Sequence, residues 1–100
     1  MKIEVFNDGD RAWAAAVYVQ DGYGGEPASA AVYIHEVTVV MPAAGIVQDA
    51  GRSVRVMGVG ETFHRHRQDA VAWAAAQIRR SAANLYRQAE ELAEPRVVTV

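Results

Sequence analysis

The sequence predicts an α+β fold, with four or five antiparallel strands in one sheet and one long C-terminal helix packed on one face. Short apolar segments, separated by turns that contain glycine or proline, occupy residues 1–60. One unbroken, alanine-rich helical pattern then occupies residues 67–94. Hairpin-linked strands followed by a covering helix form two layers. We therefore expect the order β-β-β-β-α in a single domain, 1–100.

The first two predicted strands are joined by a tight turn. Residues 2–6 alternate apolar and charged side chains, as a half-buried strand does. Residues 7–10 (Asn-Asp-Gly-Asp) have the composition of a hairpin turn. Residues 11–20 begin with an alanine-rich stretch that favours helix, but Val-Tyr-Val at 17–19 favours strand. Because the turn precedes them, we expect a strand there, followed by a loop at 21–29.

The next two predicted strands occupy residues 30–41 and 52–60, with a loop at 43–51 between them. The apolar residues of the first change face along the strand, from Val32 and Ile34 to Val37 and Val39. A slip of one residue in the alternation is what a β-bulge produces, so we expect a bulge at His35–Glu36.

The predicted helix begins at about Arg67 and ends at about Glu94, because Pro95 follows. Apolar residues recur every three or four positions and predict the face that packs on the sheet. That expected core stripe is Val71, Ala74, Ile78, Ala82, Leu85, Ala89 and Leu92. Residues 96–100 form either a fifth short strand or an apolar tail.

Basic residues are concentrated in the second half of the chain, although the formal net charge is only −2. Residues 1–51 contain two basic residues and seven acids, whereas residues 52–87 contain seven arginines and two acids. A helix N-terminus attracts anions, and arginine forks suit phosphate. The junction between the strands and the helix therefore predicts an anion or nucleic-acid site at Arg52, Arg55, Arg65 and Arg67. The alternative is that Arg65 and Arg67 are solvated, or pair with Asp69, Glu61 and acids of the N-terminal hairpin.

No catalytic residue is predicted. No serine has a Gly-x-Ser-x-Gly context, and no carboxylates are paired for acid–base work. His64 and His66, with Glu61 or Asp69, have the residue types of a zinc or iron site. The intervening arginines disfavour a dication, so we expect neither metal nor cofactor.

A second apolar surface is predicted on the outer side of the helix. At 100° per residue, Trp73 lies about 140° from Ile78, opposite the expected core stripe. Ala72 and Ala76 accompany it, and Arg80 lies further along the same side. A helix that is apolar on two sides is usually buried on two sides, so we expect self-association through these four residues.

The composition places further limits on function. The chain contains no cysteine, begins without an apolar leader run, and lacks a segment of about 20 apolar residues that could cross a bilayer. We therefore expect a cytoplasmic protein with no membrane partner. The sequence predicts a small non-enzymatic binding or regulatory module that acts as a homodimer. One alternative is a dimeric nucleic-acid-binding protein that uses the arginines, and a weaker one is a small metal-dependent enzyme.

Overall fold

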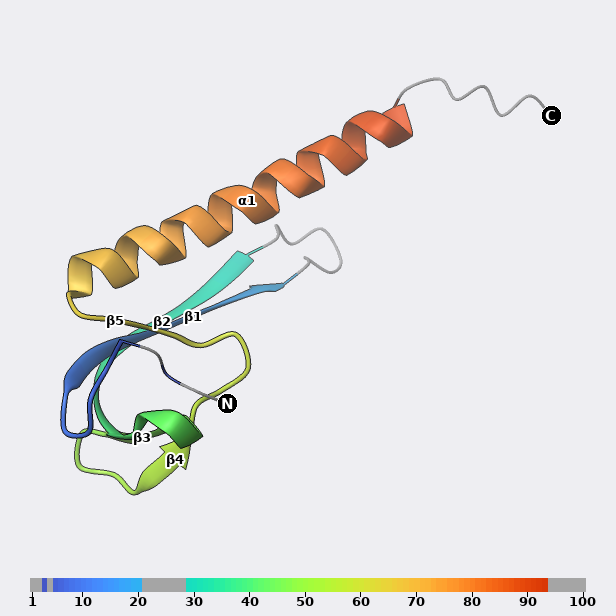
Figure 1. Ribbon diagram of the computed structural model, residues 1–100. Coiled ribbons are helices and arrows are strands. Elements are labelled where there is room, and N and C mark those ends of the chain that lie inside the picture. The colour runs from blue at the N-terminus through green and yellow to red at the C-terminus, as the bar shows by residue number, and fades with distance from the viewer. Residues whose placement is uncertain (1–2, 4, 21–28, 94–100) are drawn as a thin grey trace.

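The computed structural model describes residues 3, 5–20 and 29–93. The elements in chain order are β1 (Arg11–Gln20), β2 (Ser29–Met41), the 3-10 turn η1 (Pro42–Ala44), β3 (Ile46–Asp49), β4 (Val54–Val56), β5 (Thr62–His64) and α1 (Arg67–Ala93). The strands form one antiparallel sheet in the order β4-β3-β2-β1-β5, and α1 lies across one face of it (Figure 1). The predicted α+β fold class, with five strands and one long C-terminal helix, is confirmed.

The short elements differ from the prediction. The expected strand at 2–6 is wrong where it is described, because Ile3, Val5 and Phe6 lie outside any strand and Val5 has a φ of 64°. The expected loop at 43–51 contains β3, and the expected strand at 52–60 shortens to β4. β5 completes the sheet by pairing with β1. The expected loop at 21–29, apart from Ser29, and the expected strand or tail at 96–100 lie outside the described residues.

The change of face in β2 has a different cause from the predicted bulge. β1 and β2 pair without interruption through His35 and Glu36, so no bulge is present there. The register shift of β2 lies between Val39 and Met41, where the strand pairs with β3. The two ends of β2 bury opposite faces, because α1 covers one face and the N-terminal segment covers the other. The buried residues of β2 therefore change from one covered face to the other along a stretch that pairs with β1 without interruption.

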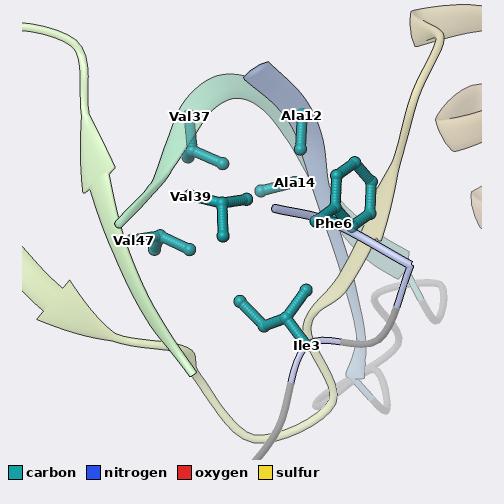
Figure 2. Packing of buried hydrophobic residues seen from close by; sticks show 7 residues of the cluster. All are labelled: Ile3, Phe6, Ala12, Ala14, Val37, Val39 and Val47. Atoms are coloured by element: carbon teal, nitrogen blue, oxygen red, sulfur yellow. The ribbon is translucent and has the colours of Figure 1, made fainter. Parts of the chain in front are cut away.

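The main core lies on the sheet face opposite α1 (Figure 2). Its buried members are Ile3, Phe6, Ala12, Ala14, Val37, Val39 and Val47. The residues at 3 and 6 reach this core from the N-terminal segment, which is anchored by a 2.7 Å hydrogen bond from the Ile3 amide to the Pro42 carbonyl. The apolar residues of that segment therefore cap the core instead of extending the sheet.

Ala74 of the predicted stripe is buried against the sheet, but the buried face of the helix is rotated away from the large residues of that stripe. Ala70 is 0% exposed and Ala74 is 3% exposed, and α1 packs mainly against β1. The large residues of the predicted stripe are partly or largely exposed: Val71 40%, Ile78 37%, Leu85 44% and Leu92 87%. The prediction that these four are buried is wrong. The small side chains face an alanine-rich central strand, and that contact turns the large ones to the flank.

Trp73 is also placed differently from the expectation. It is half-buried, and its ring centroid lies 5.9 Å from that of His64 on β5. Its own sheet therefore covers part of this side chain. Ala72, Ala76 and Arg80 are exposed, as expected for the outer side of the helix.

We predict that Ala74→Leu lowers the free energy of unfolding by about 1–3 kcal/mol, because the added methylenes overpack the contact between helix and sheet. The matched change Ala83→Leu, on an exposed position of the same helix, should alter it by less than about 0.5 kcal/mol. Urea denaturation at one protein concentration measures both. Equal effects at the two positions would contradict the observed face of α1.

Candidate functional site

A cluster of charged residues lies on the face of the sheet opposite α1. His35 comes from β2, Asp49 from the end of β3, Arg55 from the middle of β4, and Glu61 from the residue before β5. Val39 pairs with Val47, and Val47 pairs with Arg55. Residues that pair across neighbouring strands share a face, so this register places the Arg55 side chain on the core side of the sheet.

Arg55 joins two carboxylates. Its Nε and Nη2 donate to Asp49 at 2.7 and 3.1 Å, and its Nη1 and Nη2 donate to Glu61 at 2.8 and 2.9 Å. A longer bond of 3.4 Å runs from Nη1 to the Val56 carbonyl. A guanidinium has five N–H groups, and these contacts use all of them. Binding of an external phosphate by Arg55 would therefore require it to release one of its partners within the chain.

The electrostatics of this cluster hold both carboxyl groups ionised. Burial alone would raise the pKa of Glu61, which is only 9% exposed, but hydrogen bonds from Arg55 and from the Gly58 amide hold that pKa below its ordinary 4.5. The hydrogen bonds from Arg55 likewise hold the pKa of Asp49 below 3.8. Both partnerships raise the pKa of Arg55. The guanidinium stays charged, and it acts as a fixed cross-link between β3, β4 and the start of β5.

Two hollows flank Arg55 on this face. One, of about 540 Å³, lies between His35, Asp49 and Arg52. The other, of about 300 Å³, lies beside Tyr18 and Tyr33, whose rings meet edge-on with centroids 5.8 Å apart. His35 borders both hollows and directs its Nε2 to Asp49 Oδ1 at 2.8 Å. The face carries two open hollows, but its strongest charges are already neutralised internally.

The four arginines predicted to bind anions do not form one free basic surface. Arg52 is exposed beside the Arg55 cluster. Arg65 lies over the Phe6 ring, 4.9 Å from its centroid, and donates to the Val5 carbonyl. Arg67 is the exposed first residue of α1. Two of the four are therefore engaged within the chain, and the anion-binding role of the set stays a prediction.

The two histidines of the weaker metal hypothesis are not brought together with a carboxylate. His64 Nε2 lies 2.8 Å from the Thr62 hydroxyl, and burial lowers the pKa of His64 below its ordinary 6.5. His66 is exposed just before α1, and Glu61 is engaged by Arg55. Among residues 3, 5–20 and 29–93, no three His, Asp or Glu side chains are grouped to hold a metal ion.

Sequence reasoning missed the Arg55 cluster because Asp49 was assigned to a loop. The available signal was the pair of acids six residues to either side of Arg55, which a tight hairpin and a following turn bring back to it. Those spacings identify a contact only once β3 and β4 are known to pair.

Comparison with known proteins found no matching family, no similar characterised protein and no similar solved structure. In the described part of the chain, no helix combines the length and apolar character that crossing a membrane requires.

We predict that Arg55→Leu lowers the free energy of unfolding by about 3 kcal/mol, because it leaves Glu61 charged, buried and unpaired. Arg52→Leu removes the same charge from an exposed position near the same hollow and should change stability by less than about 0.5 kcal/mol. Chemical denaturation at neutral pH distinguishes the two. Similar stability of both variants would show that the cluster does not cross-link the strands.

We also predict that stability falls as the pH is lowered through the range below 4.5. The folded-state pKa values of Glu61 and Asp49 lie below those of the unfolded chain. In this pH range the unfolded state therefore binds more protons than the folded state, and acid stabilises the unfolded state. The lowered pKa of His64 acts in the same direction, below 6.5. In Arg55→Leu the pKa of Glu61 should rise, so the free energy of unfolding should decrease less steeply between about pH 5 and 3 than it does in the parent protein. Denaturation midpoints across this range measure it, and parallel profiles for parent and variant would contradict the assignment.

Proposed function

We propose that this protein is a small, non-enzymatic binding or regulatory module that acts as a homodimer. The observation that carries the proposal is an apolar stripe along α1 whose members, apart from the half-buried Ala75, are exposed. We call it the heptad stripe, and its members are Val71, Ala75, Ile78, Ala82, Leu85, Ala89 and Leu92. Their spacing alternates between four and three residues, which is the repeat of helices that pack against other helices.

The second half of α1 supports the need for a partner. The helix extends past the ends of β1 and β2 at Gln20 and Ser29 (Figure 1), and every residue from 82 to 92 is exposed. An isolated helical segment of that length is marginal in water, because helices are stabilised mainly by packing of an apolar face. A second copy that covers the heptad stripe would supply this packing.

The end of the β1–β2 hairpin continues the same apolar surface. A groove of about 160 Å³ lies between Ile78 and Leu85 on α1 and Val19 and Ala30 on the strands. Apolar surface that is continuous between two elements is what protein interfaces use, and monomers expose it only sparingly. The groove widens the stripe into a face that can receive side chains from a partner.

The nucleic-acid alternative has weaker support. It requires a row of free cations that can release counterions from phosphates. Arg55 and Arg65 are engaged within the chain, which leaves Arg52 and Arg67 from the predicted set. A metal-dependent enzyme has less support again, since His64 contacts Thr62 and Trp73. A cytoplasmic location also stays a prediction.

Sedimentation tests the homodimer. We expect the parent protein to sediment as a dimer at high micromolar concentration, and Ile78→Glu to sediment as a monomer, because a charge would be buried in the interface. The control is Ala76→Glu, which introduces the same charge on the opposite flank, beside Trp73, and should leave the dimer intact.

The same pair of variants identifies the surface that is used. Dissociation by Ala76→Glu and not by Ile78→Glu would place the interface on the side of Trp73, Ala72 and Arg80. A parent protein that remains monomeric would sink the proposed function. Far-ultraviolet circular dichroism of both variants checks that α1 is retained.

A further inference from the structure

We propose that the two copies pair with their α1 helices antiparallel along the heptad stripe. This inference rests on the homodimer proposed above and adds the direction and register of the interface. The occupant of the exposed stripe is a second copy of the same helix.

The sizes of the stripe residues favour this direction. Large residues and alanines alternate: Val71, Ile78, Leu85 and Leu92 occupy one heptad position, and Ala75, Ala82 and Ala89 occupy the other. In a parallel pair, like positions meet, so alanine would face alanine and leucine would face leucine in successive layers. In an antiparallel pair, each large side chain faces an alanine, and the layers fill evenly.

Charges along α1 also favour the antiparallel direction. The first half of the helix carries Arg67, Arg79 and Arg80 against a single acid, whereas its end carries Glu90 and Glu91 and no basic residue in the last turn. Acids at a helix C-terminus are unfavourable for the helix dipole. Antiparallel pairing moves them beside the more basic half of the partner and also opposes the two dipoles.

The face of the helix that is buried at one end becomes free at the other. Leu92 is eighteen residues after Ala74, which is five helical turns, so both lie on the same side of α1 about 27 Å apart. Ala74 packs against the sheet near the start of α1, whereas Leu92 near its end is 87% exposed. A two-fold axis between antiparallel helices, with the stripes on their facing flanks, places both sheets on the same side of the helix pair. The end of each helix then lies toward the partner's sheet.

One register satisfies these features together. Placing Ala82 opposite Leu85 of the partner subunit also places Ile78 opposite the partner's Ala89, and Ala75 opposite the partner's Leu92. The exposed segment 82–92 is then covered by residues 75–85 of the partner. In this register, Arg79 and the partner's Glu90 lie within one turn of each other along the seam. Both residues are on the side of α1 away from the sheet, as 100° per residue from Ala70 requires.

Disulfide trapping tests the direction, and the chain has no cysteine to interfere. The variants are Ala75→Cys and Leu92→Cys, purified separately, mixed and mildly oxidised. We expect the mixed 75–92 product to dominate on non-reducing gels. Ala75→Cys alone should give little product, because its two copies would lie about 25 Å apart along the helices. Ala76→Cys mixed with Glu91→Cys is the matched control at the same level on the opposite flank, and it should remain uncross-linked.

Other cross-linking patterns in a protein that sediments as a dimer overturn the inference and leave the homodimer standing. Dominant 75–75 and 92–92 products would establish parallel helices in a dimer that still stands. A mixture that sediments as a dimer but gives none of these products, or that gives only the 76–91 product, would place the interface elsewhere. A parent protein that sediments as a monomer removes both proposals.

Discussion

The contact of α1 with an alanine-rich central strand is the constraint on which the rest of the structure depends. β1 pairs with β2 on one side and β5 on the other, and its residues Ala14 and Ala15 are fully buried. α1 packs mainly against this strand and covers Ala70 and Ala74 completely or nearly so. Small side chains let two backbones approach closely, and a close contact leaves no space for the larger residues of the same helix. The position of Val71 and Ile78, at the start of the heptad stripe, on the flank of that contact follows directly.

The opposite face of the sheet is organised by a second constraint, the ion cluster around Arg55. A buried carboxylate without a partner is strongly unfavourable, so Glu61 requires a cation once the chain closes over it. Arg55 meets this need and joins β3, β4 and the residue that precedes β5, but in doing so it uses all of its N–H groups. An arginine that looks like a ligand-binding residue in the sequence is thus a structural cross-link in the fold. The hollows beside it are lined by His35, Arg52, Tyr18 and Tyr33.

Long elements with a strong local pattern were predicted well from the sequence, whereas short strands that depend on pairing with other strands were not. α1 was predicted to within a residue at each described end, because a long alanine-rich pattern and a following proline act locally. β1 and β2 were also predicted to within about a residue, in spite of the helical propensity of the alanines in β1. β3, β4 and β5 have three or four residues each, and pairing alone defines such strands. The predicted strand at 2–6 was wrong for the same reason, because packing in the core, and not alternation along the segment, determines where Ile3 and Phe6 lie.

The sequence by itself determined the class of fold, the extent of its helix and the presence of both small and large apolar residues along that helix. These properties depend on local propensity and periodicity, which the order of residues carries directly. Only the tertiary structure decided which of those residues meet the sheet, that Val71, Ile78 and Leu85 remain partly exposed, and that Arg55 pairs with Asp49 and Glu61. Periodicity shows that a helix has an apolar side, but the size of the side chains on the opposing strand selects the side that is buried. Charge partners depend in the same way on strand register, which no local pattern in this chain encodes.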